Sequence, residues 1–264
     1  MNSGRLIEVK DFETMTVSRV ETPDVDLSVV IPTFNEAANI PGILRAVVDL
    51  PAAFDVLVVD DNSPDGTADL VRELRATFPQ LHLEVRQNKD GLGPAYIHAF
   101  KWAMDKGYTY LFEMDADFSH PPKALVPMLA LLEEDKADVV VGSRYKKGIR
   151  VRKWPLGRII LSLGASLYVR IITGLPVADP TAGFVGYKTK ALSTLNLDDI
   201  RFKGYAFQIA LKFWLWKKNF RIIEFPITFT DRTSGDSKMN TSIINEAIFG
   251  IIGMKWRSVF KKPA

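Results

Sequence analysis

Short apolar runs alternate with amphipathic stretches through the first half of the chain. The runs are rich in valine, isoleucine and leucine, whereas the stretches between them repeat their apolar residues every three or four positions. The runs predict strands at 28–31, 56–59, 81–85, 108–112 and 139–141. The amphipathic stretches predict helices at 39–49, 67–78, 94–106 and from 121 onward. This alternation predicts an α/β fold with a Rossmann-like, mainly parallel central sheet flanked by helices.

The second half of the chain combines basic loops with strongly apolar helices. The pattern predicts helices at 157–173, 204–218 and 241–260, and a strand at 220–230. The last helix is amphipathic and ends with Lys255, Trp256 and Arg257. Its apolar face can pack in a core, or it can lie flat on a lipid surface with the tryptophan among the headgroups. Both interpretations stay open at this point.

Composition and charge narrow the class of protein. With 264 residues and 47% hydrophobic content, the chain can form one large domain over 27–264, preceded by a polar arm over 1–26. A net charge of +3 does not call for nucleic acid, and the absence of cysteine excludes disulfides. The apolar segments 159–172 and 243–254 are shorter than the roughly 20 residues of a bilayer span. Because no secretory signal pattern is present either, we expect a cytoplasmic protein that meets a membrane from the side.

Asp115 and Asp117 follow the predicted strand at 108–112 and form a carboxylate pair at its end. Two hard oxygen ligands suit Mg²⁺ or Mn²⁺, which keeps several waters and can also bind a substrate diphosphate. Glu36 and Asp61 follow two other apolar runs in the same way. Each acid alone could equally cap a helix or form a turn. Together they predict a site at the carboxyl edge of a parallel sheet, where ligands bind.

The parts of a nucleotide-activated sugar can be assigned to these loops. Asp61 can accept a hydrogen bond from the base or ribose, and Glu36 can accept from ribose hydroxyls. Phe34 offers a flat face to the base, although ordinary core packing is an equal alternative. A metal ion on Asp115 and Asp117 would offset the charge that grows on a leaving diphosphate.

Basic residues recur where phosphates would need them. Arg144 follows a predicted strand, and Arg158 and Ser162 lie one helical turn apart, so they point the same way. A loop rich in glycine and serine runs from Arg232 to Lys238 and can close over a diphosphate. These positions indicate phosphate on both substrates.

The histidines His82, His98 and His120 are spread over a strand, a helix and a turn without metal-ligand spacing. We therefore assign none of them a catalytic role. The chain has no Gly-x-Gly-x-x-Gly pattern and no Gly-Lys-Ser phosphate loop, which argues against dinucleotide and ATP chemistry.

Six ordered motifs resemble those of GT-A-fold, family-two glycosyltransferases, and among them the polyprenol- or dolichol-phosphate mannose synthases. The motifs lie at 30–36, 59–67, 91–93, 114–121, 142–145 and 231–238. The resemblance covers about 27–260 and implies a nucleotide-binding half over 27–118 and an acceptor-binding half over 119–264. One departure is Phe34, where the family often has tyrosine.

The resemblance also implies roles for individual residues. The implied donor contacts are Pro32, Phe34, Glu36, Val59, Asp61, Asp115, Ala116, Asp117, Arg144, Arg232 and Lys238. The implied metal ligands are Asp115 and Asp117, and the implied catalytic set is Asp117 with Arg144, Arg158 and Ser162. Arg158 and Ser162 are similar to positions that receive a lipid phosphate.

The reaction that the resemblance implies is inverting, metal-dependent transfer of mannose from GDP-mannose to a polyprenyl or dolichyl phosphate. The enzyme would lie on the cytoplasmic face of a membrane, with a small membrane-anchoring subunit as a further partner. Three alternatives stay open. The same fold can use UDP-glucose or a non-lipid acceptor, the chain can be a non-catalytic phosphoacceptor receiver domain, or it can be an inactive scaffold subunit.

Overall fold

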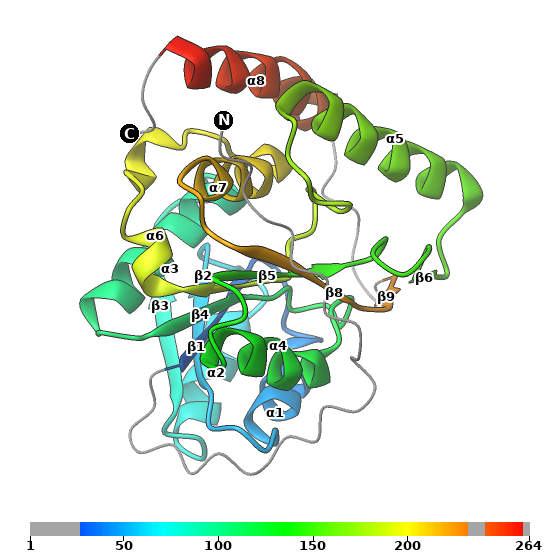
Figure 1. Cartoon of the computed structure of the whole chain (residues 1–264). Coiled ribbons are helices and arrows are strands. Elements are labelled where there is room, and N and C mark those ends of the chain that lie inside the picture. The colour runs from blue at the N-terminus through cyan, green and yellow to red at the C-terminus, as the bar shows by residue number, and fades with distance from the viewer. Residues whose placement is uncertain (1–26, 232–240, 261–264) are drawn as a thin grey trace.

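The computed structural model describes residues 27–231 and 241–260, with side chains in the last helix from 248 to 259, so the predicted arm over 1–26 lies outside it. A sheet lies at the centre of the fold, with helices on both sides (Figure 1). It has seven strands in the order β3-β2-β1-β4-β7-β5-β8. Four neighbouring strands pair in parallel: β1 (Leu27–Thr33), β2 (Asp55–Asp60), β3 (Leu81–Val85) and β4 (Tyr110–Glu113). The other strands are β5 (Val139–Ser143) and β8 (Ile222–Pro226), which also pair in parallel, and the antiparallel β7 (Val185–Lys188) between β4 and β5. The mainly parallel sheet is therefore confirmed.

Helices cover both faces of this sheet. One face carries α1 (Ile40–Val48), α2 (Thr67–Arg75) and α4 (Leu125–Glu133), and the other carries α3 (Leu92–Asp105) and α7 (Tyr205–Lys217). Val29 and Ile31 of β1 enter the first core, whereas Val30 enters the second. Strands that are buried on both faces need continuous apolar runs, which explains why the sequence marks them clearly. Short turns complete the fold at η1 (Pro122–Ala124), α6 (Thr189–Leu192) and η2 (Leu197–Asp199).

Two helices form an outer layer over α7, namely α5 (Leu156–Thr173) and α8 (Thr241–Phe260) (Figure 1). The Tyr168 hydroxyl donates to the carbonyl of Ile248 over 2.8 Å, and Lys255 Nζ donates to the carbonyl of Thr173 over 3.0 Å. Met254 of α8 is buried in the core. One face of α8 therefore packs inward, as the first interpretation of this helix predicted.

The strand predicted at 220–230 is two strands, β8 and β9 (Phe229–Thr230). Pro226 ends the pairing of β8 with β5, and β9 pairs instead with β6 (Val151–Arg152). Proline lacks the N–H that would continue a sheet ladder, so the chain leaves the sheet there.

Strand β7 was not predicted, and it lies antiparallel between β4 and β5. Its apolar run is short and contains Gly186. A Cβ at this glycine would lie 2.3 Å from the Phe112 ring, so the glycine makes room for an aromatic side chain of the neighbouring strand. Such a packing reason cannot be seen in the local pattern.

Helix α5 contradicts the expectation that no apolar segment is long enough to cross a bilayer. Its 18 residues have the length and composition of a membrane-crossing helix, and only 17% of them are buried. It is the one such helix among the described residues. The sequence estimate counted only the apolar run 159–172, but the helix begins at Leu156 and extends to Thr173.

Candidate active site

The predicted acidic loops meet at one edge of the sheet. Strands β2, β1 and β4 are parallel neighbours, so their carboxyl ends lie side by side. Thr33 at the end of β1 donates its hydroxyl to Asp60 at the end of β2 over 2.7 Å. Each loop then turns through one non-glycine residue with positive φ: Asn35 (57°), Asn62 (55°) and Phe118 (59°). The prediction that three strands deliver acids to one edge is confirmed.

The two acids after β2 have different surroundings. Asp60 is fully buried and accepts hydrogen bonds from Thr33 and Ser63, so it holds the loop together. Asp61 is 8% exposed and accepts a 2.9 Å bond from Nη1 of Arg86. Burial raises the pKa of Asp61, and the charge of Arg86 acts in the opposite direction. Arg86, which the sequence analysis did not single out, thus orients the predicted nucleotide-binding carboxylate.

The loop after β1 carries Phe34 and Glu36. The ammonium group of Lys89 lies 3.5 Å from the centroid of the half-buried Phe34 ring, a cation–π contact on one face. The Glu36 carboxylate accepts a 2.9 Å bond from the Asn39 side chain, and the Glu36 N–H donates to Thr67 over 3.0 Å. Both predicted donor contacts therefore lie at the expected edge, already held by neighbouring side chains.

Three predicted donor contacts are small or apolar residues at the ends of the strands. Pro32 and Val59 are opposite each other in the β1–β2 register, and the Val59 side chain is fully buried in the core. Ala116 is 3% exposed. A ligand contact from Val59 would therefore come from its backbone.

Asp115 and Asp117 follow β4 and differ in exposure. The Asp115 side chain is 41% exposed, whereas Asp117 is buried and accepts a 3.0 Å bond from the N–H of Ser119. The Asp115 N–H donates to Nδ1 of His120 over 3.1 Å. Within 27–231 and 241–260, no three histidine or acidic side chains form a metal cage. Two carboxylates fit Mg²⁺ or Mn²⁺ that takes its other ligands from water and a diphosphate.

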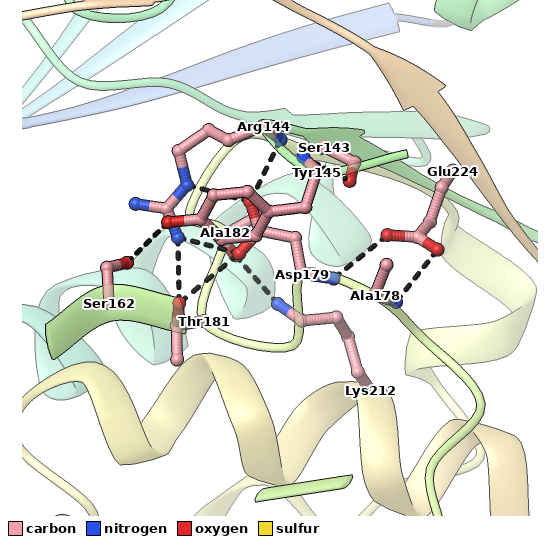
Figure 2. A network of polar contacts seen from close by, with 10 residues as sticks. All are labelled: Ser143, Arg144, Tyr145, Ser162, Ala178, Asp179, Thr181, Ala182, Lys212 and Glu224. Atoms are coloured by element: carbon pink, nitrogen blue, oxygen red, sulfur yellow. Dashed lines mark hydrogen bonds and ion pairs between the residues drawn. The ribbon is translucent and has the colours of Figure 1, made fainter. Parts of the chain in front are cut away.

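Arg144 lies just after β5 in a network of polar contacts (Figure 2). Its Nε and Nη2 donate to the two carboxylate oxygens of Asp179 over 2.7 and 2.6 Å, and Nη2 also donates to Thr181. Burial alone would lower the pKa of Arg144, but the charge and hydrogen bonds of Asp179, together with smaller contributions from Tyr145 and Tyr205, act in the opposite direction, and the pKa is raised. Glu224 accepts from the N–H groups of Ala178 and Asp179, which anchors the loop that carries Asp179. Arg144 is therefore held in one orientation.

Arg144 and Arg158 share one tryptophan ring. Their guanidinium carbons lie 5.5 and 4.1 Å from the ring centroid of Trp154. The Tyr145 hydroxyl donates to Ser162 over 2.7 Å (Figure 2). We call Arg144, Tyr145, Trp154, Arg158 and Ser162 the basic–aromatic cluster. The structure thus brings Arg144 together with Arg158 and Ser162, which the sequence placed on a different segment.

Arg158 is also paired with an acid, because its Nη1 donates to Asp231 over 2.8 Å. Both side chains are partly exposed, in contrast to the buried pair of Arg144 and Asp179. Arg232 and Lys238 lie outside the described residues, so their phosphate contacts stay predictions.

Lys212 and Glu113 are two further buried charged residues near the site. Lys212 is fully buried and donates to the carbonyl of Ala182 over 2.7 Å (Figure 2), and Glu113 accepts a 3.2 Å bond from Tyr187. Burial lowers the pKa of Lys212 to about 8 and raises that of Glu113 to about 8, while the attraction between the two opposes both shifts. One signal could have identified Lys212 from the sequence, because a lysine within an apolar helix needs a buried partner.

The loop after β4 that carries Asp115, Asp117 and His120, which we call the carboxylate loop, is adjacent to the basic–aromatic cluster. The Thr230 N–H donates to the carbonyl of Ser119 over 3.3 Å, and the Phe229 ring lies 5.3 Å from the Trp154 ring. A donor diphosphate held at one and an anion held at the other would therefore be neighbours. Asp179, Arg86 and Glu224 were missed because each is far along the chain from its partner.

The chain is similar in sequence to several known proteins. The family model of Glycosyl transferase family 2 matches residues 28–195. An undecaprenyl-phosphate mannosyltransferase of Micrococcus luteus is 43% identical over 222 residues, which cover 84% of this chain and 90% of the relative. A polyprenol monophosphomannose synthase of Mycolicibacterium smegmatis is 43% identical over 224 residues, with 84% of each chain covered.

A solved structure is similar in fold. It is the glucosyl-3-phosphoglycerate synthase of Mycobacterium tuberculosis in complex with Mn²⁺, UDP and phosphoglyceric acid, with a TM-score of 0.62 and 18% identity. The match covers 90% of this chain and 79% of that one. At this identity the likeness concerns the fold alone, and it confirms the expected GT-A arrangement.

Proposed function

The chain belongs to glycosyl transferase family 2 and is a glycosyltransferase, and we propose that it transfers mannose from GDP-mannose to a polyprenyl or dolichyl phosphate. The names of two relatives at 43% identity support the sugar and the acceptor. The observation that carries the proposal is the basic–aromatic cluster beside the carboxylate loop. Arg144 and Arg158 over one Trp154 ring suit an acceptor that is itself an anion.

The loops after β1, β2 and β4 would hold the donor. Asp61, oriented by Arg86, would accept a hydrogen bond from the base or ribose. Asp115 and Asp117 would hold Mg²⁺ or Mn²⁺ on the diphosphate. When bound, this cation supplies positive charge against the diphosphate as it leaves.

The acceptor phosphate would react directly in a single displacement. One of its oxygens forms a bond to the anomeric carbon of mannose, the bond from that carbon to the diphosphate oxygen breaks on the opposite side, and GDP leaves with inversion. A phosphate is already ionised near neutral pH, so no side chain has to remove a proton. Arg144, Arg158 and Ser162 would orient it and screen its charge.

The outer layer of the fold supports attachment to a membrane surface. Large apolar side chains on α5 and α8 are between 55% and 72% exposed: Leu156, Ile160, Leu161, Leu167, Ile171, Phe249, Trp256 and Val259. Such a surface is unfavourable in water and suits an interface with lipid. Arg158 and Ser162 lie on α5 as well, so a lipid held at this face could reach them with its phosphate. The cytoplasmic side and a small membrane-anchoring subunit remain predictions.

A transfer assay with labelled donors tests the proposal. The purified chain is incubated with Mn²⁺ or Mg²⁺, a short polyprenyl phosphate, and either GDP-mannose or UDP-glucose, and label is counted in the organic phase. We expect label from GDP-mannose alone, none with the unphosphorylated polyprenol, and none after chelation of the metal. Lipid label from UDP-glucose alone would show that the proposed donor is wrong. Donor turnover without lipid label would show that the proposed acceptor is wrong.

A matched pair of variants tests the acceptor site. Arg158→Gln should raise the KM for polyprenyl phosphate about tenfold or more, because a charge-assisted contact is lost, and should leave the KM for GDP-mannose unchanged. Arg152→Gln is the control, because Arg152 is a nearby exposed arginine outside the cluster. An equal effect of both variants would refute the assignment.

A further inference from the structure

His120 connects the carboxylate loop to its surroundings through one ring nitrogen. The side chain is buried, and Nδ1 accepts the 3.1 Å bond from the Asp115 N–H. Because an N–H group donates to it, Nδ1 carries no proton, and the proton of the neutral ring is on Nε2. The ring therefore fixes the backbone at the more exposed of the two carboxylates. His82 and His98 lie elsewhere and contact Asp55 and Glu84.

The His120 ring also contacts two aromatic residues next to the basic–aromatic cluster, Phe184 and Phe229. His120 stacks on Phe184 with centroids 5.0 Å apart and an interplanar angle of 12°. Phe229 meets it at 5.5 Å and 76°, and Phe229 in turn packs against Trp154. Phe184 follows the loop whose Asp179 holds Arg144. One imidazole thus lies between the backbone of Asp115 and two supports of the basic–aromatic cluster.

Resting on the proposed function, we propose that His120 is a positioning residue that sets the carboxylate loop and the acceptor cluster at a fixed separation. Its Nδ1 fixes Asp115 toward the metal diphosphate, and its ring fixes Phe184 and Phe229 behind the arginines. The hydrogen bond to the Asp115 backbone and the packing against Phe184 and Phe229 use different parts of the side chain. They can therefore be removed one at a time.

Two substitutions separate the hydrogen bond from the packing. His120→Asn places an amide oxygen near the position of Nδ1 and removes the ring, whereas His120→Phe keeps a ring and removes the acceptor. His98→Gln is the control, because His98 is exposed on α3 and its side chain contacts Glu84 of β3. The readouts are Mn²⁺-dependent GDP binding by calorimetry, the Mn²⁺ spin-resonance spectrum with GDP, and the acceptor KM.

The expected results are opposite for the two variants. His120→Phe should weaken Mn²⁺-dependent GDP binding about 10- to 100-fold, the usual effect of losing an outer-shell partner of a metal ligand, with little change in acceptor KM. His120→Asn should retain GDP binding and raise the acceptor KM. His98→Gln should match the wild type in both.

Three outcomes would overturn the positioning role. They are unchanged GDP binding in His120→Phe, equal losses in both variants that follow a common loss of thermal stability, and an unchanged acceptor KM in His120→Asn. An unchanged acceptor KM in His120→Asn would show that the ring does not position the acceptor cluster, and the proposed coupling of the two sites through His120 would then be wrong. A wild-type protein that fails to bind GDP with Mn²⁺ would instead overturn the proposed function, so the two failures are distinguishable.

Discussion

Replacing Asp179 with asparagine tests how Arg144 is held. The Asp179 carboxylate accepts hydrogen bonds from the Arg144 N–H, Nε and Nη2 at 2.9, 2.7 and 2.6 Å. The Asp179 side chain is not exposed at all, and that of Arg144 is 11% exposed, so little solvent screens the pair. Asparagine keeps one acceptor oxygen, but its amide group must face one of the arginine donors.

The size of the effect follows from these contacts. A hydrogen bond to a charged group contributes about 1.5–3 kcal/mol, and breaking a buried ion pair costs about 3–5 kcal/mol because the remaining charge stays buried. We expect Asp179→Asn to lower the free energy of unfolding by about 3 kcal/mol. For a chain of this size, that corresponds to a fall in Tm of about 6–12 °C. The acceptor KM should also rise about tenfold, with GDP binding largely unchanged.

Urea unfolding followed by tryptophan fluorescence measures the loss. The double variant with Arg144→Met completes a cycle, because it removes the buried charge that Asp179→Asn leaves without a full partner. The double variant should lose less than the sum of the two single losses, with a coupling of about 2 kcal/mol. A loss below about 1 kcal/mol for Asp179→Asn, or strictly additive effects, would refute this account of Arg144.

Further predictions concern catalysis, acid stability and packing. Asp117→Ala should remove most turnover and His82→Ala should retain it; unchanged turnover in the first would refute the metal assignment. Although burial opposes it, Arg221 lowers the pKa of Asp138 below 3.8, so its stabilisation is present above that pH and lost as pH falls through the lower folded pKa. Asp138→Asn should therefore be less stable than wild type at pH 7, with a difference that shrinks below about pH 4 in urea titrations; a constant difference would contradict this. Gly186→Ala should cost about 1–3 kcal/mol in the same assay, because its Cβ would meet an aromatic ring 2.3 Å away, and an unchanged midpoint would contradict that packing.

The local pattern of the sequence was sufficient for the parallel half of the fold. Strands buried on both faces require continuous apolar runs, and the helices between them require one apolar face, so both are visible without a partner. The acids at the ends of these runs could be assigned to one edge for the same reason, since parallel neighbours end on the same side. That is why the placement of Glu36, Asp61, Asp115 and Asp117 at one edge of the sheet could be predicted from the sequence.

Tertiary structure decided what connects these groups. Arg144 and Asp179 are 35 residues apart, and Asp61 and Arg86 are 25 apart, with no period that links them. The antiparallel strand β7 could not be predicted, because Gly186 is required by the Phe112 ring on another strand. The spacing of the histidines indicated no role for His120, although its Nδ1 accepts a hydrogen bond from the Asp115 N–H. Short-range patterns report which face of an element is buried, whereas a hydrogen bond between distant residues exists only once the register of the sheet and the packing of the loops bring them together.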